Sequence, residues 1–219
     1  VWNALVSGNN QLANGSERVK FFDEQVSPFA ALVEDTPANL LELHAIHPSD
    51  KPILLWADRL LSVPEKWKEV DCIPGFQMVY DAPVVPDFTK TGITALTVND
   101  ITGMLALTKL TKPGPFGTRT IEFGNYEGIF ANGQLVAMTG QRFHCFNHIE
   151  ISAVCTHPAY LGRGYAKQLL LSQLTKIVNS SVVPYLHVRQ DNERAIHVYK
   201  TLGFVVRMPV YFYVIKKQS

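Results

Sequence analysis

The residues best suited to chemistry in this sequence lie in a glycine-rich loop that contains Gly162 and Gly164. An apolar, strand-like run at residues 149–154 leads into the loop, and a run with helical periodicity at residues 165–178 leads out of it. The first N–H groups of a helix lack backbone partners and the helix dipole favours negative charge there, so this arrangement predicts a bound phosphate. One such loop is weak evidence, because Gly-x-Gly also serves as an ordinary turn.

The elements that position this loop follow a clear order after residue 92. The pattern predicts a strand, a helix, three strands, a helix, a strand, a helix and two strands. The expected strands span residues 93–96, 126–130, 134–139, 148–156, 183–188, 204–207 and 210–215, and the expected helices span residues 99–110, 165–178 and 192–202. This order predicts an α+β fold whose sheet is largely antiparallel on its early side. It argues against a dinucleotide site, whose fingerprint belongs in the first strand–helix unit of an alternating fold.

The segment before residue 91 is expected to form a smaller α/β subdomain, with residues 91–219 as the second domain. The boundary is placed in residues 81–92, where prolines and loop residues cluster. Before it, strands or extended segments are expected at residues 40–46 and 52–56, and short helices at residues 58–61 and 64–70. No catalytic constellation is visible in residues 1–90, so their role stays unassigned.

Composition excludes several classes of function. The 219 residues are 47% apolar with a formal net charge of +1, which predicts a substantial core and no general attraction to nucleic acid or membrane. The three cysteines are too few for a disulfide framework and lack zinc-finger spacing, so a cytoplasmic protein without a metal site is expected. No apolar run is long enough to span a membrane. The sequence is silent on oligomeric state, and a homodimer stays open.

Two motifs together resemble the GNAT superfamily of acyl-CoA-dependent N-acyltransferases. The phosphate loop of that family reads Gln/Arg-x-x-Gly-x-Gly/Ala, and here Gly164 and Ala166 match it whereas Leu161 departs from it. Residues 192–204 are similar to a second family motif, Asn-x-x-Ala-x-x-x-Tyr-x-x-x-Gly-Phe. The resemblance covers residues 93–217 and implies a GNAT-type mixed, mostly antiparallel sheet flanked by helices. The two-part layout is similar to the glycine N-acyltransferase branch.

The resemblance assigns acetyl-CoA as cosubstrate and gives most of the candidate residues a role. The loop is expected to wrap the pyrophosphate, the strand before it to pair with the pantetheine arm like an added strand, and Asn192 to cap its helix and bond that arm. Tyr199 matches the family tyrosine that protonates the departing thiolate. The expected cofactor-binding residues are Val154, Cys155, Thr156, Leu161, Gly162, Arg163, Gly164, Tyr165, Ala166 and Asn192.

Glu150 lies eleven residues before Leu161. It is the expected general base, because a glutamate at that distance before the loop resembles the base of the histone acetyltransferase branch. A carboxylate on an otherwise apolar strand would be partly desolvated, which raises its pKa and makes it a better base. A solvent-facing Glu150 is the alternative, and a water could act in its place. Cys155 is expected to be a small buried side chain and not a nucleophile, because no partner base is marked.

The predicted activity is transfer of an acetyl group to the primary amine of a small molecule, such as an amino acid or a polyamine, by direct attack in a ternary complex. Phe116 and Arg119 are expected to line the acceptor site, because they fall where a family loop borders it. Two alternatives remain: acetylation of a protein lysine or N-terminus, and a catalytically weak module that binds acyl-CoA.

Overall fold

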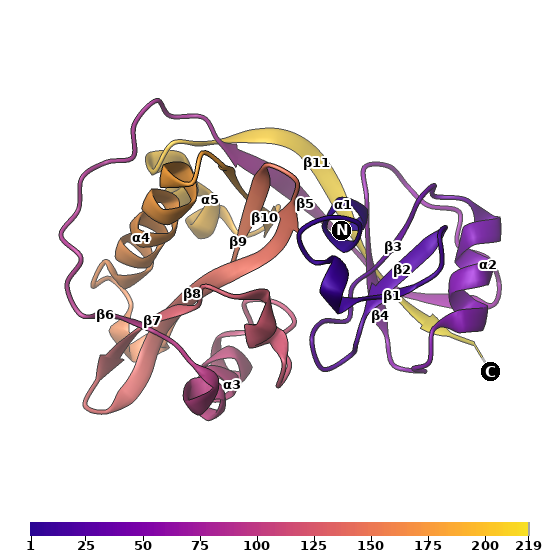
Figure 1. The fold of residues 1–219 in the computed structure, drawn as a ribbon, viewed down its shortest axis with the longest axis horizontal. Helices are drawn as coiled ribbons and strands as arrows, with labels where there is room; N and C mark the ends of the chain where they lie inside the picture. Colours follow the sequence, from indigo (N-terminus) through magenta and orange to yellow (C-terminus); the bar gives the residue numbers. More distant parts are fainter. Residues whose placement is uncertain (219) are drawn as a thin grey trace.

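A computed structural model describes residues 1–218 and is organised around one eight-stranded sheet (Figure 1). Its spatial order is β4-β11-β5-β10-β9-β8-β7-β6. The strands are β4 (Ile53–Ala57), β5 (Trp67–Tyr80), β6 (Ile93–Ala95), β7 (Glu127–Ala131), β8 (Gln134–Cys145), β9 (His148–Thr156), β10 (Val183–Arg189) and β11 (Phe204–Lys217). Every neighbouring pair is antiparallel except β9 and β10, which are parallel. The predicted α+β class and mostly antiparallel sheet are confirmed.

Helices α4 (Tyr165–Asn179) and α5 (Glu193–Thr201) cover one face of this sheet. The predicted apolar stripe of α4 is buried there, with Leu170 and Leu174 packed against Ile151 of β9 and Phe204 of β11. Burial of this stripe removes apolar surface from water and fixes α4 on the sheet. The glycine loop at the start of α4 is thereby held at the end of β9.

The opposite face is covered by α3 (Ile101–Thr111) and by the first part of the chain. That part contains α1 (Trp2–Leu5) and a small sheet of β1 (Ala13–Gly15), β2 (Val19–Phe22) and β3 (Ala30–Leu32). Phe22 and Phe29 pack with Phe143 of β8 in one buried cluster. Short 3-10 helices η1 (Asn10–Leu12), η2 (Val98–Asp100), η3 (Thr120–Phe123) and η4 (Pro158–Tyr160) join the larger elements.

Two expectations for the first 90 residues are wrong. Residues 40–46 belong to α2 (Pro37–Ile46), whose start is fixed by Pro37 and by the Thr36 hydroxyl, which accepts a bond from the Asn39 N–H at 3.2 Å. Residues 58–61 and 64–66 are not helical, and Trp67 begins β5. Pairing with β11 along residues 67–80 outweighs the local helical signals. The strand expected at residues 52–56 is confirmed as β4.

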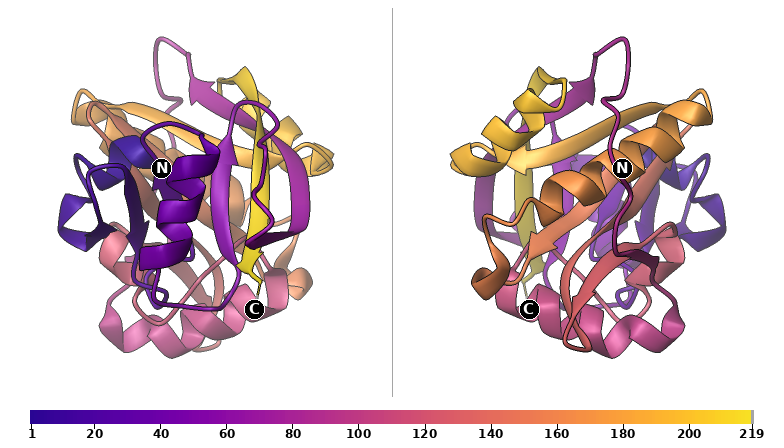
Figure 2. Two further views of the ribbon diagram at one scale, coloured as in Figure 1. Left: turned by 90° about the vertical axis from the view of Figure 1, so that its right-hand side faces the viewer. Right: turned by 90° about the vertical axis from the view of Figure 1, so that its left-hand side faces the viewer.

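The expected pair of C-terminal strands is one strand of 14 residues, β11, with a β-bulge between Val206 and Met208. β11 lies between β4 and β5, so strands from the first 90 residues complete the central sheet. Residues 81–92 cross over α4 with little regular structure (Figure 2), tied down where Lys90 meets the buried Glu127 at 3.0 Å. The division at residue 90 stays a prediction, and the sheet continues across it. None of the helices described in residues 1–218 is long and apolar enough to cross a membrane.

Candidate active site

The parallel strands β9 and β10 separate to form a fork. They pair at three positions only, the last of which joins Glu150 to Tyr185. Beyond this point β9 stays paired with β8 as far as Thr156, and β10 stays paired with β5 as far as Arg189. Across the described chain, no pairing links residues 151–156 to residues 186–189. The two facing strand edges therefore offer backbone groups to a ligand that enters as an added strand.

A β-bulge interrupts β9 inside this fork. Ala153 has a φ of 53°, and the register to β8 shifts between the pairs Met138–Cys155 and Gly140–Ser152. A left-handed alanine costs on the order of 1 kcal/mol, and a bulge re-aims the neighbouring backbone groups. Strain of this kind at a strand edge fits a site where backbone N–H groups are positioned for a ligand.

The glycine loop lies at the open end of the fork and leaves a set of backbone donors free. Gly162 and Gly164 have φ values of 78° and 77°, and a Cβ added at either would meet no atom within 4 Å. α4 begins without a side-chain cap, and within residues 1–218 none of the N–H groups of residues 162–167 donates a hydrogen bond. Arg163 and Leu161 are exposed beside them. These residues fit a pyrophosphate, because several aligned N–H groups at a helix start bind an anion.

Further residues at the fork fit the rest of a coenzyme A chain. The Thr156 hydroxyl oxygen is buried and has no hydrogen-bond partner in the described chain, so the end of β9 holds a polar group ready for a ligand. Asn192 caps α5 by accepting a bond from the Ala195 N–H at 3.2 Å. Its amide nitrogen has no protein partner within residues 1–218, which leaves a hydrogen-bond donor free at the start of α5.

Tyr199 is buried on α5, with its ring 6.0 Å from that of Phe204. Burial raises the pKa of its hydroxyl to about 12, because desolvation disfavours the phenolate. The hydroxyl therefore stays protonated at neutral pH and can act as a proton donor. In the described residues it makes no hydrogen bond to protein.

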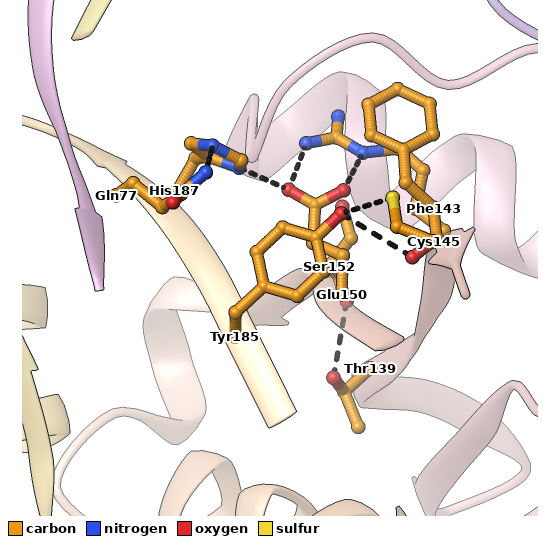
Figure 3. A network of polar contacts seen from close by, with 9 residues as sticks. Gln77, Thr139, Phe143, Cys145, Glu150, Ser152, Tyr185 and His187 are labelled. Atoms are coloured by element: carbon orange, nitrogen blue, oxygen red, sulfur yellow. Dashed lines mark hydrogen bonds and ion pairs between the residues drawn. The ribbon is translucent and has the colours of Figure 1, made fainter. Parts of the chain in front are cut away.

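Glu150 lies at the closed end of the fork and is fully buried (Figure 3). Arg142 donates to its two oxygens from Nε at 2.8 Å and from Nη2 at 2.7 Å, and His187 Nδ1 lies 2.8 Å from Oε1. Burial alone would raise the pKa of this carboxyl, but the Arg142 charge and the hydrogen bonds lower it to about 2. The expected rise in pKa is thus wrong in direction, and the solvent-facing alternative is wrong too. An ionised carboxylate held in this way is a weak base.

His187 was not among the candidates from sequence, yet it is bonded directly to Glu150. Its side chain is 2% exposed, and burial lowers its pKa to about 4, so the ring is neutral at pH 7. The ring centroid of Trp56 lies 3.4 Å away. The one signal that could have found His187 is a histidine in the otherwise apolar strand at residues 183–188.

The remaining candidates lie apart from this centre. Burial raises the pKa of the Cys155 thiol to about 11, which leaves it protonated and unfit as a nucleophile. The Arg119 guanidinium is held by Glu122 at 2.6 and 2.9 Å. Phe116 packs edge-on against Tyr126 and lines a cavity of about 300 Å³ next to the first part of the chain.

Comparison with known proteins places this geometry in a family. The chain is 33% identical to a solved GNAT-family protein from Novosphingobium aromaticivorans, with a TM-score of 0.93 over 100% of this chain and 97% of the other. Residues 95–204 match the family model described as "Acetyltransferase (GNAT) family". The chain belongs to the GNAT family. GNAT proteins use acyl-CoA, which agrees with the free donors of the glycine loop and the open edges of the fork.

More distant relatives of this GNAT protein share its fold or part of its sequence. A GCN5-related N-acetyltransferase from Kribbella flavida has the same fold at 16% identity, with a TM-score of 0.62 over 97% of this chain and 94% of the other. The N-alpha-acetyltransferase RimI of Mycobacterium tuberculosis is 36% identical over 84 residues, which are 36% of this chain. The chain spans about half the length of that relative (51%) and 15% of a second curated relative, from Mycobacterium leprae.

Proposed function

We propose that this GNAT protein transfers an acetyl group from acetyl-CoA to the primary amine of a small molecule, such as an amino acid or a polyamine. The observation that carries the proposal is the fork between β9 and β10 with free N–H groups at its open end. A second observation that supports it is the buried, protonated Tyr199 on α5, which packs on the sheet that contains the fork. Both reactants are held together in a ternary complex, so no enzyme nucleophile is required.

The backbone does most of the binding in this proposal. The N–H groups of Gly162, Arg163, Gly164, Tyr165 and Ala166 hold the pyrophosphate, with Leu161 beside them. The edge of β9 at Val154, Cys155 and Thr156 pairs with the pantetheine arm, and Asn192 bonds it from α5. One N–H at Val154 or Cys155 polarises the thioester carbonyl, as an oxyanion-hole donor does. Acetyl-CoA supplies the activated acyl group.

Proton transfer is divided between Tyr199 and the solvent. Tyr199 is the group assigned to protonate the departing thiolate, because its hydroxyl is protonated at neutral pH; burial raises its pKa to about 12 and so makes it a weaker acid than an exposed tyrosine. Glu150 has both oxygens occupied and a pKa of about 2, which makes it a poor acceptor for the amine proton. We therefore assign deprotonation of the amine to water, so that the free-amine fraction of the acceptor reacts.

A small acceptor is supported by the packing on the face opposite α4. Phe22 and Phe29 from the first part of the chain pack on Phe143 of β8 in a buried cluster, so this face of the sheet is covered and offers no open groove there for an extended peptide. Phe116 contributes to a cavity of about 300 Å³ at the edge of this packing. The identity shared with RimI favours a protein N-terminus as the second candidate acceptor.

A panel of acceptors tests the proposal. Purified protein is incubated with acetyl-CoA and amino acids, polyamines or short peptides, and free thiol release is recorded. Turnover with small amines supports the proposal. Turnover with peptides alone supports the second candidate, and binding of CoA without any turnover identifies a weak acyl-CoA-binding module.

Tyr199→Phe tests the proton donor. The variant is expected to lose about a hundredfold or more in kcat, because general acid catalysis contributes on that scale, while CoA affinity stays within about twofold. Tyr80→Phe is the matched control, since Tyr80 donates to the Val84 carbonyl and lies outside the proposed site. Equal kcat in Tyr199→Phe and the parent protein would remove the acid role.

A further inference from the structure

A continuous chain of side-chain hydrogen bonds crosses five consecutive strands at the closed end of the fork. Figure 3 shows the part of it that runs from Gln77 through His187 to Glu150. Arg142 on β8 bonds Glu150 on β9, and Glu150 bonds His187 on β10. His187 continues to Gln77 on β5 at 3.0 Å, and Gln77 accepts from Arg207 on β11. His187 and Gln77 are direct cross-strand partners, so the side-chain bond reinforces the backbone register.

β-bulges place both ends of this chain. Between the pairs Gln141–Ile151 and His144–Ile149, β8 has two residues where β9 has only Glu150, and one of the two is Arg142. At the other end Arg207 is the extra residue of the bulge in β11. A bulge re-aims a side chain relative to the ladder, so these two arginines reach partners that a regular strand would not offer them.

The donors of this chain point towards Glu150 from both ends. Arg207 can only donate, so the oxygen of the Gln77 amide faces it and the Gln77 nitrogen donates to His187 Nε2. His187 therefore accepts at Nε2 and carries its proton on Nδ1, from which it donates to Glu150. Each member has one arrangement that satisfies its neighbours, and this fixes the orientation of the ring.

The position of His187 indicates what this chain of hydrogen bonds does. The last backbone pair between β9 and β10 involves Tyr185, and His187 is two residues further along β10, on the same face of that strand. Its bond to Glu150 thus spans the two strands just where their ladder stops. The pairs β5–β10 and β8–β9 are also held together by their backbone ladders. Between β9 and β10, by contrast, the side-chain bond from His187 to Glu150 lies where the backbone ladder ends and the strands separate.

We propose that His187 is a positioning residue that fixes the width and angle of the β9–β10 fork by holding Glu150 across its closed end. It touches neither the acyl donor nor the amine in this proposal, which rests on the acyl-CoA function proposed above. The edge of β9 that receives the pantetheine arm begins at Val154, four residues beyond Glu150. A loosened closed end therefore misplaces the N–H groups that bind and polarise the thioester.

Three variants test this role through the Kd for CoA, and through KM and kcat if turnover is found. His187→Leu removes both ring bonds at similar volume and is expected to weaken CoA binding about tenfold, the scale of one hydrogen bond to a charged group. His187→Gln keeps a donor and an acceptor and should restore affinity to within about threefold. Arg207→Leu cuts the chain at its exposed end and should leave affinity within about twofold.

The outcomes separate this proposal from the one on which it rests. Failure of the parent protein to bind CoA overturns the proposed function, whereas equal CoA affinity in His187→Leu and the parent overturns the positioning role alone. Equal losses in His187→Leu and His187→Gln also overturn it, because the bonds would then not matter. If His187→Leu does not fold, Gln77→Leu releases the ring from one side, and unchanged CoA affinity in that variant refutes the proposal.

Discussion

The two ends of the fork between β9 and β10 are built in opposite ways. The open end is exposed, consists of backbone N–H groups around Gly162 and Gly164, and leaves those donors without protein partners in the described residues. The closed end is buried and consists of charged side chains, and both carboxylate oxygens of Glu150 are bonded. Water can satisfy exposed donors until a ligand displaces it, whereas a buried charge must be satisfied by the protein itself.

This difference separates the parts that bind from the part that holds the geometry. Ligand binding needs unsatisfied groups, which are tolerated only where solvent reaches them. A fixed strand separation needs bonds that solvent cannot replace, and these are buried. We expect substitutions at the closed end to act mainly on stability and on the shape of the fork, and substitutions at the open end to act mainly on affinity for acyl-CoA.

The largest expected effect is at Glu150. Glu150→Ala leaves the Arg142 guanidinium buried without a counter-charge, which should lower the free energy of unfolding by about 3–5 kcal/mol in urea denaturation. Glu122→Ala is the control, because its pair with Arg119 is partly exposed and should contribute less than about 1 kcal/mol. Replacing Arg142 and Glu150 together by Met and Leu should recover much of the loss. Similar losses for Glu150→Ala and Glu122→Ala would contradict the claim that burial makes the charge pair at the closed end important for stability.

A loss of stability of intermediate size is expected when the pH is lowered. The folded-state pKa of His187 is about 4, below its ordinary 6.5, so the unfolded chain binds more protons between these values and stability falls as the pH is lowered through them. Going from pH 7 to pH 4.5 should cost about 2–3 kcal/mol from this group, and Glu150 adds a further loss below its ordinary pKa of 4.5. Urea titrations at the two pH values measure the change. His187→Gln should show a clearly smaller loss, and an equal loss would exclude His187 as the cause.

The smallest effect on stability is expected at the open end. Gly164→Ala puts a side chain on a left-handed residue and should cost about 1–2 kcal/mol, while CoA binding weakens by about tenfold because the Cβ enters the anion site. Gly92→Ala is a matched control, since Gly92 has a φ of 68°, equally open surroundings and no place in the loop. Comparing these two variants separates the cost of backbone strain from the effect on ligand binding. The same CoA affinity in both variants would mean that the loop does not hold the ligand.

The sequence was sufficient to predict the open end because backbone binding depends on local features. Glycines, a strand and a helix start are visible in 20 consecutive residues, and the second motif at residues 192–204 is equally local. The closed end joins residues from five strands, of which Gln77 and Arg207 are far apart in the sequence. No spacing rule connects them, so the sequence points only to Glu150, and it predicts the wrong direction for the pKa of that carboxyl because nothing local reveals the Arg142 partner.

The same limit applies to the first 90 residues. Local signals favoured strands at residues 40–46 and helices at residues 64–70, and both were reversed in the structure. Thr36 and Pro37 are a helix start that the sequence did contain, and it was overlooked. Trp67, by contrast, joins a strand through pairing with Lys217, a partner 150 positions away, which no local pattern can reveal.

The place of β11 in the sheet has a consequence for how the protein is made. β11 is inserted between β4 and β5, two strands that are synthesised long before it. Until then, both carry unpaired edges, and contacts of such long sequence separation form slowly. A chain stopped short of residue 204 would therefore lose an interior strand and split the sheet in two. Folding of the nascent sheet should therefore depend on residues 204–217, and on protection from aggregation until they are synthesised.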